Sequence, residues 1–119
     1  METGFDGGTA TLAAMSDGTA SLYLSNGGGV IGGVQHATVR RAAMEFVRSV
    51  GRRLTEFRAT ERTPLPRVGR TVFYVLTDSG VYTAEADEQA LGEQRHALSE
   101  LFHSGDDVIT QLRLVAETK

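Results

Sequence analysis

The sequence predicts an α+β fold with a ββα-ββα arrangement, in which one antiparallel sheet of four or five strands carries a long amphipathic helix packed across it. Two hairpin signals and one helical stripe support this prediction. An Asp-Gly pair at residues 17–18 and an Asp-Ser-Gly triplet at residues 78–80 each separate two runs of strand-forming residues. Apolar residues recur at helical spacing over residues 39–57. We therefore expect two hairpins, each followed by a helical segment.

The first hairpin is predicted over residues 9–25, where a strand-compatible run and an alternating run flank the Asp-Gly turn. A two-residue turn centred on Asp17 and Gly18 sets the register of the two strands and pairs Leu12 with Tyr23. Neither face of this hairpin is cleanly polar. We therefore expect both faces to be covered.

The residues after this hairpin are unusually rich in glycine. Within residues 27–33 the glycines are Gly27, Gly28, Gly29, Gly32 and Gly33. They match the Gly-x-Gly-x-x-Gly pattern, but a dinucleotide site also needs a parallel βαβ unit and an acidic residue about 20 residues further on. The preceding strands are expected to be antiparallel and the following region is rich in arginine. A P-loop is excluded because no Gly-Lys-Ser/Thr follows.

Two interpretations of this glycine run remain open. In the first it is a flexible connection between a strand and a helix. In the second its backbone amides lie at the N-terminus of the helix and form an anion pocket, with His36 and Arg40 supplying positive charge. The candidate ligand residues are Gly27, Gly28, Gly29, Gly32, Gly33, His36 and Arg40.

The long helix is predicted from one apolar stripe that continues for five turns. The stripe consists of Val39, Ala43, Phe46, Val47, Val50, Leu54 and Phe57. Arginines and Glu45 alternate on the other side at spacings of three and four residues, which is typical of a solvated helix face. Residues 60–69 contain two prolines and are expected to form an extended connector.

The second half is predicted to repeat the hairpin-helix pattern. Residues 71–77 form the run richest in β-branched and aromatic side chains. Residues 81–86 are predicted to form the second strand of the hairpin, after the turn. A helix is expected to start at residue 87 and to resume over residues 97–103 until Gly105 stops it. Residues 106–116 fit either another helix or a fifth strand, and we favour the helix.

Length and composition indicate one domain. The chain has 119 residues, of which 40 % are hydrophobic, and this is enough for a single core. We expect residues 1–119 to form one domain, with residues 1–8 as a flexible N-terminal tail. The absence of cysteine excludes disulfides and thiolate metal ligands. No apolar run approaches the roughly 18 residues that cross a bilayer, so we expect a cytoplasmic protein without a membrane partner.

Charge is distributed unevenly along the chain. Residues 40–70 contain nine arginines and three glutamates, whereas the segments on either side are acidic. Specific nucleic-acid binding needs stacking or base-edge contacts besides phosphate contacts, and no suitable aromatic residues lie among these arginines. We therefore predict no binding to DNA or RNA, and we expect the arginines to pair with carboxylates of the same chain or of a second subunit.

No catalytic residues, metal site or cofactor are predicted. His96, His103 and Asp106 contain the atoms of a metal set, but the residues between them do not fix a ligand geometry. Ser99 lies four residues before His103 without the Gly-x-Ser-x-Gly context of a nucleophile. The sequence leaves open whether the chain has an enzymatic activity.

The order hairpin, helix, hairpin, helix over residues 9–104 resembles the roadblock/profilin-like architecture. This resemblance implies a dimeric scaffold or partner-binding module rather than an enzyme. The sequence therefore predicts a non-catalytic protein-binding or scaffold module that forms a homodimer. The alternative is a protein, possibly an enzyme, that binds a small anionic ligand or nucleotide at the glycine run.

Overall fold

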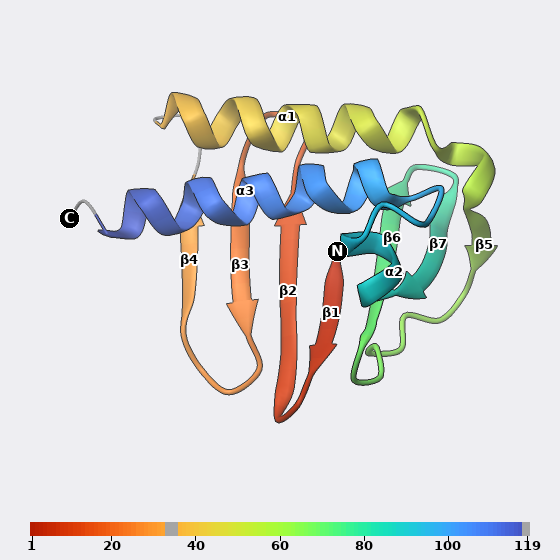
Figure 1. The fold of residues 1–119 in the computed structure, drawn as a ribbon. Coiled ribbons are helices and arrows are strands. Elements are labelled where there is room, and N and C mark those ends of the chain that lie inside the picture. Colours follow the sequence, from red (N-terminus) through yellow and green to blue (C-terminus); the bar gives the residue numbers. More distant parts are fainter. Residues whose placement is uncertain (33–35, 118–119) are drawn as a thin grey trace.

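The computed structural model describes residues 1–32 and 36–117, and over these residues it shows an α+β fold built on one antiparallel sheet of seven strands (Figure 1). The strands are β1 (Glu2–Phe5), β2 (Gly8–Ala14), β3 (Ala20–Leu24), β4 (Gly29–Gly32), β5 (Arg58–Thr60), β6 (Arg70–Thr77) and β7 (Gly80–Asp87). The helices are α1 (Ala37–Gly51), the 3₁₀ turn η1 (Leu54–Glu56), α2 (Glu88–Gly92) and α3 (Ser99–Glu117). The predicted α+β class with one antiparallel sheet is confirmed, but the sheet has more strands than the four or five expected. The ββα-ββα arrangement is matched only roughly, because four strands precede α1 and three more strands precede α2.

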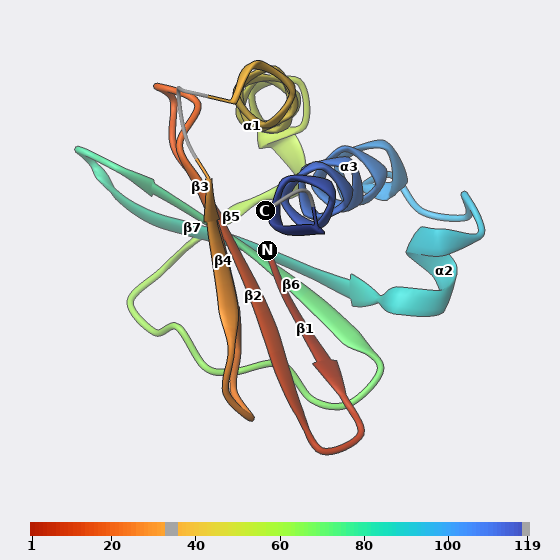
Figure 2. The same ribbon diagram turned by 90° about the vertical axis from the view of Figure 1, so that its left-hand side faces the viewer.

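The strands follow the order β4-β3-β2-β1-β6-β7-β5, and each pairs antiparallel with its neighbours. Helices α1 and α3 pack against each other and lie on the same face of this sheet (Figures 1 and 2). We call the opposite side the outer face. The connector over residues 61–69 runs along the outer face in the view of Figure 2.

The core lies between the sheet and the two long helices. Leu101, Val108 and Leu112 from α3 form its centre and are fully buried, as are residues from α1 and α2. The largest buried side chains are Leu91, Leu98, Leu101, Leu112, Val39, Val108 and Thr71. The apolar stripe of α1 therefore faces both the sheet and a second helix.

Residues 2–5 form a strand near the middle of the sheet, so the expectation of a flexible tail over residues 1–8 is wrong. Strand β1 pairs with β2 through Thr3 and Ala10 and with β6 through Thr3 and Thr71. The hydroxyls of Thr3 and Thr71 are 2.8 Å apart and share a hydrogen bond. Strand β1 thus joins the two hairpin halves of the sheet.

The first hairpin exists, but its predicted register is wrong by one residue. Leu12 pairs with Leu22, and Tyr23 pairs with Thr11. The loop contains one more residue than a two-residue turn allows, because Gly18 adopts a positive φ of 95° after a tight turn. The shift turns Leu12 and Leu22 toward the helices and leaves Tyr23 on the outer face.

The described part of the glycine run, residues 27–32, forms a turn and a strand rather than one continuous loop. Gly29 and Gly32 begin and end β4, which pairs with β3. A Cβ at Gly32 would lie 2.8 Å from Leu112 Cδ2 and 3.3 Å from Val39 Cγ1. Gly32 therefore allows the two long helices to approach the edge of the sheet closely.

The long helices differ from their predicted bounds in opposite ways. Helix α1 ends at Gly51, so Leu54 is exposed in η1, and Phe57 lies beyond the helix with its ring against Phe73.

Helix α3 instead continues through Gly105 to include residues 106–116. Phe46 and Met1 pack so closely over Gly105 that a Cβ there would lie 2.8 Å from Met1 Cε. Gly105 marks a close contact rather than a helix end.

The second hairpin and the start of α2 match their predictions. Strands β6 and β7 pair from Arg70 with Asp87 to Thr77 with Gly80. Asp87 caps α2 by accepting a hydrogen bond from the backbone N–H of Gln89. The outer-face side chains of β6 and β7 lie beneath the connector.

Candidate functional site

A segment without regular secondary structure, residues 61–69, crosses the outer face between β5 and β6 (Figure 2). We call it the strap. The Tyr74 hydroxyl donates a hydrogen bond of 2.6 Å to the carbonyl oxygen of Pro64. At the other end, the N–H of Gly69 donates to the carbonyl oxygen of Gly4 at 2.9 Å. The strap is therefore attached to the sheet at both ends.

Gly4 allows the strap to pass close to β1. A Cβ at this position would collide with backbone carbonyl groups of Pro66 and Arg67. Val68 forms a parallel bridge with Gly4, which continues this contact. The strap thus packs directly on the backbone of a central strand, and a side chain on Gly4 is incompatible with that arrangement.

A cavity of about 360 Å³ lies between the strap and the outer face, and we call it the strap cavity. Val72 and Tyr74 from β6 and Thr83 from β7 form its floor. Because Thr83 pairs with Arg58 across β7 and β5, Arg58 lies on the same face of the sheet. Leu65 lines the cavity from the strap and remains largely exposed to solvent. The cavity therefore has an apolar floor and roof and a charged edge.

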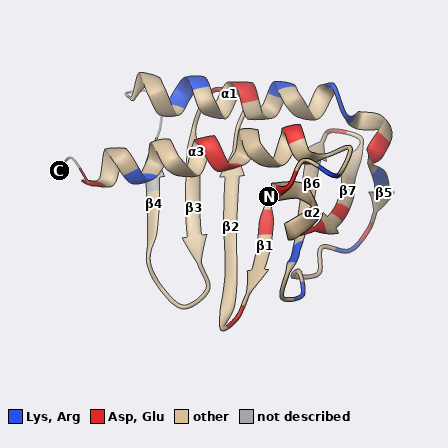
Figure 3. Cartoon of the chain, in the orientation of Figure 1, with Lys and Arg blue, Asp and Glu red and all other residues tan. Residues whose placement is uncertain are grey.

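Three arginines line the strap cavity and form no ion pair with any described carboxylate. They are Arg58 on β5 and Arg62 and Arg67 on the strap. Glu85 also lines the cavity, but its Oε2 lies 3.1 Å from Nε of Arg70. Figure 3 shows basic residues recurring from β5 along the strap. Positive charge is therefore in excess around the cavity.

The hydroxyl of Tyr74 remains protonated at neutral pH. Burial raises the pKa of Tyr74 above its ordinary value, and the nearby negative charges of Glu2 and Glu85 raise it further. A neutral phenol keeps the hydrogen that it donates to Pro64. The attachment of the strap is therefore maintained throughout the physiological pH range.

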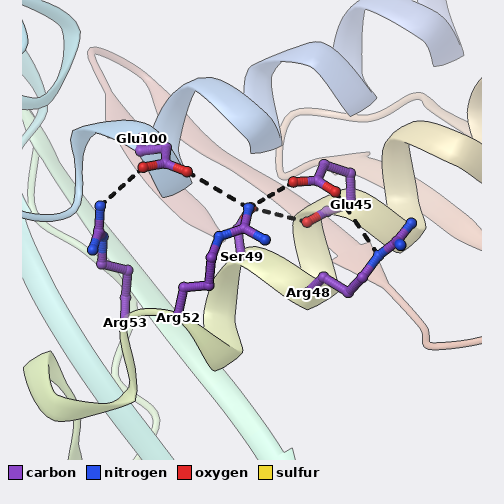
Figure 4. A network of polar contacts seen from close by, with 6 residues as sticks. All are labelled: Glu45, Arg48, Ser49, Arg52, Arg53 and Glu100. Carbon is purple, nitrogen blue, oxygen red and sulfur yellow. Dashed lines mark hydrogen bonds and ion pairs between the residues drawn. The ribbon is translucent and has the colours of Figure 1, made fainter.

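A separate group of charged residues joins α1 to α3 (Figure 4). Nη2 of Arg52 lies 2.6 Å from Oε1 of Glu45 and 3.6 Å from Oε1 of Glu100, and Nη2 of Arg53 lies 2.9 Å from Oε2 of Glu100. The hydrogen bond from Arg52 is the largest cause that lowers the pKa of Glu45. For these arginines the expected pairing with carboxylates of the same chain is confirmed.

The glycines predicted to bind an anion lie in different elements. Gly27 and Gly28 form the β3–β4 turn with positive φ angles of 107° and 87°. Gly29 and Gly32 belong to β4, and Gly33 lies outside the described residues. The turn is at the opposite end of β4 from the start of α1 (Figure 1). The prediction that the glycine run forms one loop before the helix is therefore wrong for the described glycines, because two of them lie in a turn and two in β4.

The two basic residues of the predicted anion site, His36 and Arg40, also lie away from the β3–β4 turn. His36 is the N-cap residue of α1, and its side chain makes no capping hydrogen bond. The side chain of Arg40 lies against Gly18 in the β2–β3 turn. The structure therefore separates Arg40 from the glycines of the β3–β4 turn by the length of the hairpin.

His96 and Ser99 accept hydrogen bonds from backbone groups at the start of α3. The backbone N–H of His96 donates to Oγ of Ser99 at 3.2 Å, and the N–H of Leu98 donates to Nδ1 of His96 at 3.0 Å. Such contacts satisfy backbone groups at the beginning of a helix. Within residues 1–32 and 36–117, no three His, Asp or Glu side chains gather as a metal site requires.

Replacing Asp106 by asparagine is expected to increase the free energy of unfolding at pH 7 by about 0.5 kcal/mol, after allowance for the partial exposure of the side chain. Burial raises the pKa of Asp106, and the positive charges of His103 and Arg113 offset only part of this effect. Asp106 in turn helps to raise the pKa of Glu88, for which burial is the largest cause. The folded state therefore contains an unfavourable carboxylate at neutral pH.

The stabilisation from Asp106→Asn should depend on pH. Because the folded-state pKa of Asp106 is raised, the folded protein takes up its proton before the unfolded chain does as the pH falls. The advantage of the variant is thus full at pH 7 and disappears near the ordinary aspartate pKa. Urea unfolding at pH 7 and pH 4 measures this difference. An equal gain from Asp107→Asn, on the exposed neighbour, would contradict the explanation.

No protein-family model, curated protein or solved structure gives a significant match to this chain. In the part of the chain that the structure describes, no helix is both long enough and apolar enough to cross a membrane. The candidate site is therefore defined by the geometry of the strap cavity and of the outer face.

The sequence did not single out the strap cavity. The sequence predicts that its arginines pair with carboxylates, and for the segment with the two prolines it predicts only an extended connector. The available signal was the pattern of arginines on both sides of Pro64 and Pro66, in a segment that is too extended for helical Arg-Glu pairs. The ion pair between Arg70 and Glu85 is not predictable from the sequence, because it depends on the register of β6 and β7.

Proposed function

We propose that this chain is a non-catalytic protein-binding scaffold module and that it acts as a homodimer through the outer face of β2 and β3. The supporting observation is that both long helices lie on the other side of the sheet (Figure 2). The strap covers the β5–β7 half of the outer face, and the outer side chains of β2 and β3 extend away from the helices. This area, which we call the open half, contains Thr11, Ala13, Ser21 and Tyr23.

The open half has the chemistry of a contact surface. Tyr23 exposes 50 % of its surface, and Ala13 is exposed on the neighbouring strand. Tyrosine is enriched at protein interfaces because it combines an apolar ring with a hydroxyl. Small side chains such as Ala13 and Ser21 allow a second sheet to approach to the usual distance of about 10 Å.

A second copy of the same chain is the simplest partner for this surface. Most soluble oligomers are symmetric, and a twofold axis places the same patch of both copies in contact. Dimeric scaffolds are also common among proteins of the roadblock/profilin-like architecture, which the sequence resembles. A twofold arrangement would place the helices of both copies on the outside, where they remain accessible to further partners.

Light scattering tests this proposal. At about 100 µM protein, chosen to exceed a typical micromolar Kd, we expect a mass of twice 12.8 kDa. Ala13→Glu should yield a monomer with an unchanged circular dichroism spectrum, because it places two like charges across the twofold axis.

The matched control is Leu114→Glu, which introduces the same charge at an exposed position of α3 on the helical side. It should leave the mass unchanged. A monomeric wild-type protein at low salt would refute the homodimer. Dissociation by Leu114→Glu but not by Ala13→Glu would place the interface on the helices instead of the open half.

A further inference from the structure

The strap cavity has the volume of a small-molecule site and is partly open to solvent. Its volume of about 360 Å³ falls within the range of roughly 300–1,000 Å³ that is usual for ligand pockets. The sheet supplies the floor and the strap supplies the roof, so a ligand would lie between two layers of the protein. A rigid floor of paired strands and a strap attached at both ends also provide a preformed shape.

The charges around the cavity favour an anion. Arg58, Arg62 and Arg67 come from three different points of the chain and surround the same space. Their guanidinium groups are paired with no carboxylate among the described residues. Arginine binds carboxylate and phosphate groups through paired, charge-assisted hydrogen bonds. Three positive charges around one cavity favour a ligand that carries more than one negative charge.

The floor and roof favour an organic ligand over an inorganic ion. Val72, Leu65 and the ring of Tyr74 present carbon surface to the cavity. An inorganic phosphate would leave this apolar surface unused, whereas a carbon skeleton would bury it. Glu85 does not oppose an anion strongly because Arg70 neutralises its carboxylate.

We infer that the strap cavity is a binding site for a small organic polyanion, a molecule that carries two or more carboxylate or phosphate groups on a short carbon skeleton. The anionic groups contact Arg58, Arg62 and Arg67, and the skeleton lies on Val72 and Tyr74. This site is distinct from the open half, because it occupies β5–β7 rather than β2 and β3. It is also distinct from the glycine run, which lies at the other edge of the sheet (Figure 1).

The unliganded protein should be strained by its own arginines. Like charges that surround one cavity repel one another when no anion is present. Removing one arginine should therefore leave the unliganded protein equally stable or slightly more stable. The same change should weaken anion binding. A purely structural role for these arginines predicts the opposite effect on stability.

Citrate, phosphate and acetate are suitable probes. We expect isothermal titration calorimetry at low salt to detect citrate binding, with phosphate at least about tenfold weaker and acetate undetectable. Arg58→Ala and Arg67→Ala should each weaken citrate binding by about tenfold or more. Thermal unfolding without citrate should show melting temperatures no lower than that of the wild type.

Arg113→Ala is the matched control, because it removes one exposed arginine from α3 on the helical side. It should leave citrate binding unchanged. The inference fails if citrate does not bind, if phosphate binds as tightly as citrate, or if Arg113→Ala weakens binding as much as Arg58→Ala. It also fails if duplex DNA binds and the cavity variants abolish that binding, since the arginines would then form a nucleic-acid surface.

The test is independent of the homodimer. Ala13→Glu, which is designed to separate the two copies, should bind citrate like the wild type. Arg58→Ala should remain a dimer by light scattering. Loss of citrate binding in Ala13→Glu would show that the cavity needs the second copy, and this would overturn the separation of the two surfaces.

Discussion

Replacing Leu101 by alanine is expected to remove about 3 kcal/mol from the free energy of unfolding. Leu101 lies on α3 at the centre of the core and has 0 % of its surface exposed. Alanine would remove apolar surface and leave a cavity that the packed helices cannot close. Because small domains have a total stability of about 5–15 kcal/mol, this single change is a large fraction of the whole.

Urea unfolding followed by circular dichroism measures the effect. Leu114→Ala is the control on the same helix, because Leu114 keeps 49 % of its surface exposed. It should cost less than about 1 kcal/mol. Similar losses for both variants would mean that α3 does not pack on the sheet as described.

Replacing Gly4 by alanine is expected to cost about 2 kcal/mol and to abolish citrate binding. The added methyl group would meet backbone carbonyls of the strap rather than the end of a flexible side chain. Backbone cannot rotate away as a side chain can, so the strap must lift from β1. The cavity would then lose its roof and the arginines at positions 62 and 67 would move away from Arg58.

Gly51→Ala is the matched control for this substitution. No heavy atom lies within 4 Å of a Cβ at Gly51, and the residue is helical. Alanine there should stabilise the helix by up to about 1 kcal/mol and leave citrate binding intact. Wild-type citrate affinity in Gly4→Ala would show that the strap position does not determine the site.

The parts of the fold that were predictable have local signals. Both hairpins contain turn residues between strand-forming runs, and the stripe of α1 repeats over several turns. Strand β6 was predictable because its β-branched and aromatic residues are dense. In each case a few neighbouring residues determine the structure, and a single sequence contains that information.

The parts that were missed depend on distant contacts. Strand β4 contains two glycines, which are depleted in strands. Gly32 is explained only by the approach of Leu112 and Val39, and Gly29 by the close backbone of Leu22. Gly105 was interpreted as a helix stop, although it accommodates Phe46 and Met1. Glycine marks both loops and close contacts, and the sequence alone does not distinguish them.

The candidate site was missed for the same reason. The arginines of residues 40–70 were treated as one basic region, but the structure divides them between two faces. Arg52 and Arg53 pair with Glu100 on the helical side, whereas Arg58, Arg62 and Arg67 surround the strap cavity. That division follows from where α1 ends and where β5 begins. Helix α1 ends at Gly51, whereas the predicted helix continued to Phe57, directly before β5.

The position of β1 has a consequence for the order of folding. Thr3 and Thr71, which join the two halves of the sheet, are 68 residues apart in the chain. Pairing them closes a large loop, whose entropy must be lost before the new contacts compensate for it. The two hairpin halves contain mostly local contacts and can form early. We therefore expect β1–β6 pairing to be the slow step, and contacts at this seam to be weak in the transition state.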